Sequence, residues 1–97
     1  MPVALVFCWC VGAVAQSNYL PPDGMVPNAE TAIKVARAVF VAHFGEPDIE
    51  LEEPLIAALV GDVWHVRGTM PPGLLGGVAE IELSKIDGRV LRLFHGR

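Results

Sequence analysis

The stretch from Gly61 to Arg97 alternates short strand-like runs with residues that form tight turns. Residues 63–67 and 78–83 each alternate polar and apolar side chains, which is the pattern of a half-buried β-strand. A loop rich in proline and glycine, residues 70–77, separates them, and Asp87-Gly88 precedes a last strand. Strands joined by such turns pair with their neighbours in antiparallel order, so the segment is restricted to a β-meander.

The last hairpin can be assigned a register because its apolar side chains must share one face. A two-residue loop at Asp87-Gly88 would place Leu83 opposite Arg92 and mix the two faces. A three-residue loop, residues 86–88, avoids this and places Gly88 in the left-handed conformation of a G1-bulge hairpin. The predicted pairs are Leu83 with Leu91, Ile81 with Leu93 and, on the outer face, Glu82 with Arg92.

Residues 28–45 have the pattern of one amphipathic helix. Asn28 can cap its start, Gly45 is a natural residue just after its end, and Pro47 prevents its continuation. Such a helix needs a sheet to cover its apolar stripe, so we predict an α+β domain with one main helix packed on a curved antiparallel β-meander. The stripe consists of Ile33, Ala36, Phe40 and Phe44.

The region between helix and meander contains two further apolar segments. Residues 49–52 alternate and Pro54 follows them, so we expect an edge strand or an extended approach here. Residues 55–60 form a second apolar run, and Gly61-Asp62 predicts a tight hairpin into the next strand. Trp64 in that strand is expected in the core; if it is exposed, it becomes the first candidate for a binding hot spot.

Residues 1–15 are expected to be a secretory signal peptide and not part of the fold. Val3–Ala15 is uncharged and almost wholly apolar, and it ends in the small-x-small cleavage pattern Ala13-Val14-Ala15. The alternative is a buried N-terminal strand. Cleavage would remove both cysteines and leave an exported protein, periplasmic or secreted, with a linker or extended lead-in at residues 16–27 and one domain at residues 28–97.

No pattern of residues predicts catalysis, a cofactor or a metal ion. His65 and His95 are expected on opposite faces of the sheet, where they cannot share an ion. The glycines of the 70–77 loop lack the Lys-Ser/Thr pair and the following helix of a phosphate cradle. The carboxylates Glu80 and Glu82 have no evident apolar pocket that would raise a pKa for acid–base work. We therefore expect a non-enzymatic binding protein.

Charged side chains are the best candidates for contact with a protein partner. Residues 46–53 carry five carboxylates, which either form a solvated edge that prevents aggregation or attract a basic partner. The net charge of −4 argues against nucleic acid and anionic membrane as partners. The candidate partner-binding residues are Asp48, Glu50, Glu52, Glu53, His65, Arg67, Glu80, Glu82 and Arg92.

A family resemblance extends over nearly all of residues 26–96. The blocks that carry it are Val26–Ala32 with its continuation through Gly45, Trp64–Pro71, Gly76–Ile81, Asp87–Leu91 and His95-Gly96. They resemble the nuclear transport factor 2-like fold immunity proteins of bacterial toxin systems. The resemblance implies a shortened cone of one main helix and a strongly bent antiparallel sheet. It also implies that the protein neutralises a toxin by binding it.

Three functions remain open at this point. The first is an immunity protein that occludes a toxin with its acidic cluster and concave sheet face, the toxin having a basic domain. The second is an exported protease-inhibitory or ligand-binding module, because the helix, the meander and the Lys85–Arg89 turn also resemble the PepSY domain. The third is a small hydrolase or isomerase, which a deep pocket with a buried carboxylate would favour.

Overall fold

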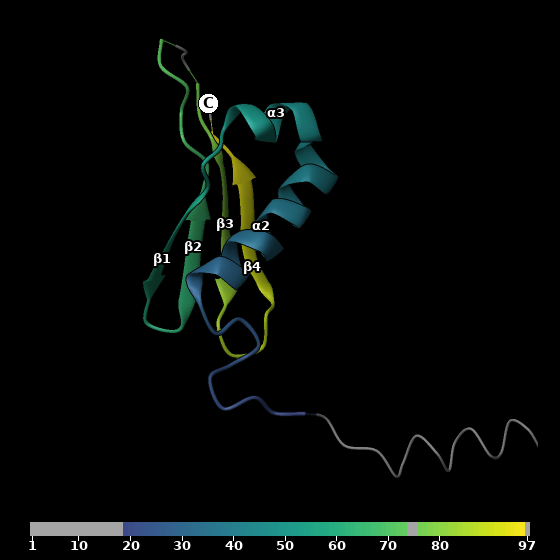
Figure 1. Cartoon of the computed structure of the whole chain (residues 1–97), viewed down its shortest axis with the longest axis vertical. Coiled ribbons are helices and arrows are strands. Elements are labelled where there is room, and N and C mark those ends of the chain that lie inside the picture. The colour runs from purple at the N-terminus through teal and green to yellow at the C-terminus, as the bar shows by residue number, and fades with distance from the viewer. Residues whose placement is uncertain (1–18, 74–75, 97) are drawn as a thin grey trace, which may run out of the picture.

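The computed structural model describes residues 19–73 and 76–96, and the predicted signal peptide lies outside this range. A long helix packs against one face of an open four-stranded antiparallel sheet, whose strands follow one another in the order β1-β2-β3-β4 (Figure 1). The predicted α+β architecture is therefore confirmed. The elements are α2 (Ala29–Phe44), α3 (Glu46–Leu51), β1 (Ile56–Val60), β2 (Val63–Arg67), β3 (Ala79–Ser84) and β4 (Val90–His95). No helix among the described residues is long and apolar enough to span a bilayer.

Helix α2 begins and ends at the residues that the sequence indicated. The Asn28 side chain accepts a hydrogen bond from the backbone N–H of Thr31 at 2.8 Å, which satisfies one of the free donors of the first turn. Gly45 ends the helix with φ of 92° and donates its N–H to the carbonyl of Val41. The buried side of α2 consists of Ala32, Ala36 and Phe40, and it covers the sheet.

Residues 46–51 form a second helix, α3, and the predicted strand or extended approach at 49–52 is wrong. Pro47 stands in the first turn of α3, where a missing backbone N–H has no intrahelical partner to lose. Glu46 and Asp48 lie in the same turn and favour the positive end of the helix dipole. Ile49 is fully buried, whereas Leu51 is 64% exposed, so a single core contact fixes this short helix.

The β1–β2 hairpin has the tight turn that Gly61-Asp62 predicted. Val60 pairs with Val63, and Gly61 has a φ of 62°, as the first position of a two-residue hairpin turn requires. Trp64 is buried in the core, as predicted, and its indole Nε1 donates to the carbonyl of Val26 at 2.8 Å.

Backbone hydrogen bonds attach the lead-in to the loop that joins β3 and β4. Met25 donates to the carbonyl of Ile86, and Val26 donates to that of Lys85, both at 3.0 Å. Val26 is 3% exposed and belongs to the core. Residues 25 and 26 therefore pack as part of the domain and not as a free linker.

The β3–β4 hairpin has a loop one residue longer than predicted, together with a compensating bulge. The N–H of Ser84 donates to the carbonyl of Arg89, so residues 85–88 form a four-residue loop in place of the predicted three. Gly88 takes the predicted left-handed conformation, with φ of 78°. Leu83 pairs with Val90 and not with Leu91, and the register shifts by one residue at this point. Beyond the bulge, the predicted pairs Glu82 with Arg92 and Ile81 with Leu93 are confirmed.

Candidate functional site

The two faces of the sheet differ in what covers them. One face packs on α2 through Trp64, Val66, Ala79, Ile81 and Leu83. The opposite face, which we call the outer face, has no helix packed on it within the described residues, because α2 and α3 both contribute their buried residues to the core on the first face. Because side chains alternate along each strand, the residues that point there follow from the register. They are Ile56, Ala58 and Val60 of β1, Val63, His65 and Arg67 of β2, Glu80, Glu82 and Ser84 of β3, and Arg92 and Phe94 of β4.

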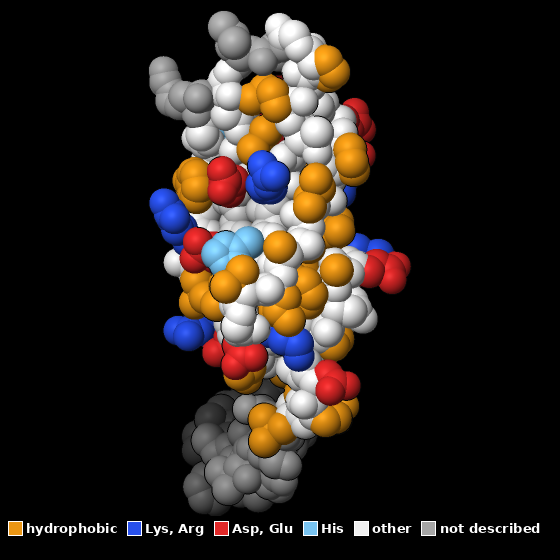
Figure 2. Space-filling view, turned by 90° about the vertical axis from the view of Figure 1, so that its left-hand side faces the viewer, with side chains coloured by type: hydrophobic (Ala, Val, Ile, Leu, Met, Phe, Trp, Pro, Cys, Tyr) orange, Lys and Arg blue, Asp and Glu red, His pale blue; other side chains and the backbone are white. Residues whose placement is uncertain are grey.

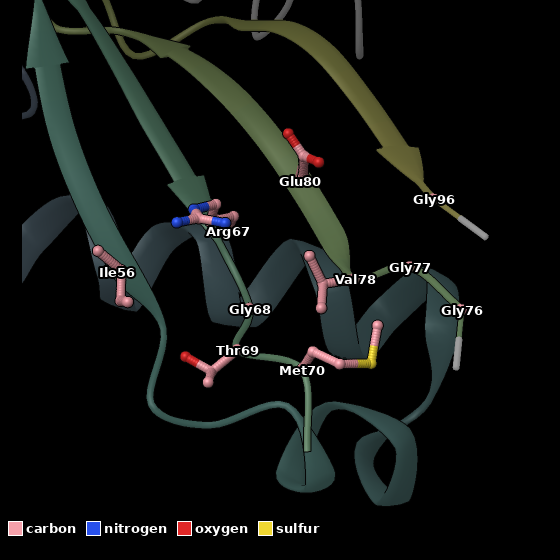
Figure 3. A pocket seen from close by; sticks show the side chains of 10 residues that line it. All are labelled: Ile56, Arg67, Gly68, Thr69, Met70, Gly76, Gly77, Val78, Glu80 and Gly96. Atoms are coloured by element: carbon pink, nitrogen blue, oxygen red, sulfur yellow. The ribbon is translucent and has the colours of Figure 1, made fainter. Parts of the chain in front are cut away.

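A hollow of about 440 Å³ lies at the end of the outer face where β2 leads into the long β2–β3 connection. Arg67 of β2 and Glu80 of β3 are cross-strand partners in its wall, and Ile56 of β1 stands beside them (Figure 3). The rest of the wall includes Gly68, Gly77 and Gly96, so backbone groups form much of its surface. Arg67 is exposed and Glu80 is half-buried, and the two side chains do not form an ion pair with each other.

A second group of charges continues the outer face away from the hollow. Glu82 lies between His65 and Arg92. Its Oε2 is 3.7 Å from Nδ1 of His65 and also 3.7 Å from Nη1 of Arg92. The Arg92 guanidinium carbon stands 4.4 Å from the centre of the Phe94 ring. The structure thus brings five of the nine candidate partner-binding residues onto one face: His65, Arg67, Glu80, Glu82 and Arg92.

The predicted acidic cluster is divided by α3 instead of forming one strand face. Arg37 of α2 binds Glu53 at 2.7 Å and Glu46 at 3.4 Å. These two hydrogen-bonded carboxylates, Glu53 foremost, raise the pKa of the Arg37 guanidinium. Asp48 and Glu50 are exposed on α3, and Asp48 lines a small hollow together with Glu52 and His95.

Glu52 does not belong to any acidic surface, because its side chain is only 8% exposed. Its Oε1 accepts a hydrogen bond from the backbone N–H of Ala79, and its Oε2 contacts Nε2 of His95, both at 2.7 Å. A Cβ atom on Gly68 would stand 2.6 Å from Oε1, so the neighbouring strand end leaves room for this carboxylate only because residue 68 is glycine. The expectation of Glu52 as a surface contact is corrected to a buried connection between α3 and the sheet.

His95 faces hydrogen-bond acceptors on both sides of its ring. Nε2 meets the Glu52 carboxylate, and Nδ1 lies 2.9 Å from the carbonyl oxygen of Gly96. The hydrogen bond to Glu52, followed by that to Gly96, raises the pKa of His95, while burial opposes the shift. Only the imidazolium can donate to both acceptors at once, so this geometry favours the charged form of the ring. The rings of Phe44 and His95 meet in a T-shaped arrangement, with 5.2 Å between their centres.

The described residues offer no group of three or more His, Cys, Asp or Glu side chains that could hold a metal ion. His65 and His95 do lie on opposite faces, as predicted, since one meets Glu82 and the other Glu52. Ile56 and Phe94 of the outer face were missed as candidates, although strand alternation would have found both. The Glu52–His95 pair joins residues 43 positions apart and has no local signal.

Two curated relatives from Escherichia coli (strain K12) are similar to this chain. The uncharacterized protein YhhH is 32% identical over 74 residues, which is 75% of this chain and 58% of the relative. The uncharacterized protein YbbC is 34% identical over 67 residues, which is 68% of this chain and 55% of the relative. The chain thus spans a little over half the length of the curated relatives it matches. No solved structure gives a significant match.

The matching family model is described as that of the NTF2 fold immunity proteins, where NTF2 stands for nuclear transport factor 2. The match covers residues 31–97, which include most of α2, all of α3 and the complete sheet. It agrees with the helix-on-sheet architecture and with the resemblance that the sequence blocks suggested. The chain therefore belongs to the NTF2 fold immunity protein family.

Proposed function

We propose that this protein is a non-catalytic immunity protein that neutralises a toxin by binding it with the outer face of its sheet. The observation that carries the proposal is the hollow beside Arg67 and Glu80, which is open to solvent and continuous with further charged side chains. Membership of the immunity protein family supports a toxin-neutralising function. The outer face of the sheet offers a surface on which a toxin could bind.

The composition of the outer face suits a protein partner. Arg67 and Glu80 offer opposite charges side by side, which select a partner of complementary pattern and disfavour others. Ile56 adds an apolar side chain that is 47% exposed. The guanidinium group of Arg92 packs over the ring of Phe94. Arginine and aromatic side chains are the usual centres of binding energy in protein interfaces.

The toxin is proposed to have a basic contact domain. The chain carries a net charge of −4, and Asp48 and Glu50 remain exposed to attract such a partner before contact. Glu46 and Glu53 contribute less because Arg37 already binds both. We also propose export of the protein, from the signal-like composition of residues 1–15. A membrane or nucleic-acid partner does not fit the acidic balance.

The pair formed by the buried Glu52 and the partly exposed His95 is the feature that could favour a hydrolase or isomerase instead. It borders a small hollow of about 170 Å³. Both carboxylate oxygens accept hydrogen bonds and both ring nitrogens face acceptors, so the two side chains are already committed to contacts within the protein. The pair supports the fold at the end of the sheet, and the binding function fits the geometry better.

The proposal is tested by capture followed by a toxicity assay. The full chain, expressed in its native host, is used as bait, and captured proteins are identified by mass spectrometry. A captured protein that arrests growth when expressed alone, and no longer does so when this chain is co-expressed, supports the immunity function. A captured protease that the chain inhibits would replace it with the PepSY-like inhibitory function.

Charge exchange then tests the proposed surface. Arg67→Glu combined with Glu80→Arg preserves the net charge but reverses the pattern at the hollow, and we expect it to abolish protection. The matched control is Glu30→Lys combined with Lys34→Glu. These two residues form an exposed ion pair of 3.5 Å on helix α2 and do not belong to the outer face. Equal protection by both variants would contradict the assignment of the outer face.

A further inference from the structure

The two edges of the sheet are built differently. At β4, the bulge beside Leu91 interrupts the ladder and Arg92 adds a charge, two devices that discourage pairing with another strand. The β1 edge, Ile56–Val60, is a regular strand that contains neither a charged residue nor a proline. Ile56, Leu59 and Val60 are 47%, 44% and 63% exposed. Seen from the β1 side of the molecule, hydrophobic side chains gather over this edge, with charged ones beside them (Figure 2).

We propose that the β1 edge binds a second copy of this chain, so that two β1 strands pair antiparallel about a two-fold axis at Ala58. The result is a dimer with one continuous eight-stranded sheet. The proposal concerns the backbone edge of β1, although the side chains of Ile56, Ala58 and Val60 project onto the outer face. Its test is the oligomeric state of the free protein, which does not depend on toxin binding.

Hydrogen-bond geometry selects the register. The two-residue turn makes Val60 and Val63 a hydrogen-bonded pair, and such pairs recur at every second residue along the hairpin. Ala58 and Ile56 therefore direct their backbone groups toward β2, and Ala57 and Leu59 direct theirs away from the sheet. When Ala57 pairs with Leu59 of the second copy, the outward-facing backbone N–H and C=O groups of both residues form hydrogen bonds. The two-fold axis produces the same pair a second time, between Leu59 and Ala57 of the second copy.

Side chains agree with the same register. Ala58 falls opposite Ala58 of the second copy, in the non-hydrogen-bonded position where Cα atoms approach to about 4.5 Å and a small side chain fits. Ile56 falls opposite Val60, and two β-branched side chains in contact favour strand pairing. No charge lies within either strand, so no like charges meet between the two β1 strands.

The test uses the fact that Ala58 would lie opposite Ala58 of the second copy. Its side chain is exposed on the outer face. Light scattering coupled to size exclusion should give the full chain a mass of about 21 kDa, twice its 10.4 kDa. Ala58→Lys and Ala58→Glu should each be monomeric, because like charges then meet at the axis. Mixed in equal amounts, the two variants should recover the dimer. Ala38→Lys, the same change at an exposed position of α2, is the control and should remain dimeric.

Recovery of the dimer in the mixture of Ala58→Lys and Ala58→Glu would show that both variants are folded, because misfolded chains would not form the dimer when mixed. A wild-type chain that is monomeric at all concentrations tested would overturn the proposal and leave the β1 edge to a strand of a different protein. An oligomer that persists in both single variants would also overturn it, because another surface would then hold the copies together. Loss of dimer in the Ala38→Lys control would place the interface on α2.

Discussion

Replacement of His95 by glutamine removes the titrating partner of Glu52 and keeps a side chain of similar reach. The wild-type contact is a charge-assisted hydrogen bond of 2.7 Å to a carboxylate that is 8% exposed. Such bonds contribute about 1.5–3 kcal/mol and neutral ones about half as much. His95 is itself 34% exposed, so solvent screening reduces the difference, and we expect a loss of about 1 kcal/mol near pH 6. For a domain of this size, that corresponds to a fall in Tm of about 4–8 °C.

The pH dependence identifies the cause. The folded pKa of His95 is raised above its ordinary 6.5 by the hydrogen bond to Glu52. A raised pKa stabilises the folded state fully below the unfolded value, and the contribution is lost as pH rises through the folded value. Urea unfolding between about pH 5.5 and pH 9 should therefore show the gap between wild type and variant largest at low pH and shrinking above 6.5.

A gap that stays constant or widens over this range would refute the charged pair. The other histidines are present in both proteins, so the comparison isolates the effect of His95. In a Glu52→Gln background, the His95 substitution should have little further effect, since the two residues act together.

Two further substitutions test the turns and the packing around this pair. Gly68→Ala should destabilise the fold by about 1–3 kcal/mol in urea, because its Cβ would stand 2.6 Å from the Glu52 carboxylate; Gly96→Ala, whose Cβ would meet its neighbours at 3.5 Å or more, is the control. A Gly68 variant as stable as the control would mean that the carboxylate moves aside freely. Gly88→Val should lower Tm by several degrees, since φ of 78° is strained for a β-branched residue, and unchanged melting would contradict the left-handed loop.

Local chemistry in the sequence predicted most of the fold. The capping side chain of Asn28, the terminating Gly45 and the Gly61 turn act within a few residues, so each could be recognised without knowledge of the tertiary structure. Strand alternation placed Trp64 and Val66 in the core, because the period of two leaves only one face for them.

The errors occurred where a short segment fits two patterns. Six residues are too few to separate a strand period from a helix period, and the alternation around Ile49 concealed that only this residue enters the core. In the last hairpin, face matching gave the register at Glu82 and Ile81 correctly. It could not show that a longer loop and a bulge at Leu91 together produce the same register.

The candidate site was only partly predictable. Charged residues of the outer face follow from alternation, so the group around Glu82 was found from the sequence. Glu52 was assigned to the surface because its neighbours in the chain are acidic. Its burial depends on Ala79 and His95, which lie 27 and 43 residues away, and no local pattern reports such contacts.

The hydrogen bonds of Met25 and Val26 to the β3–β4 loop also determine how the protein can be presented to a partner. They hold the start of the domain at the end of the sheet that carries the hairpin turns, whereas Gly96 lines the hollow at the other end (Figure 1). A tether, fluorophore or fusion attached ahead of Tyr19 would leave the hollow accessible. The same attachment placed after Gly96 would stand at its rim, so the choice of terminus decides whether a binding assay reports on the surface or obstructs it.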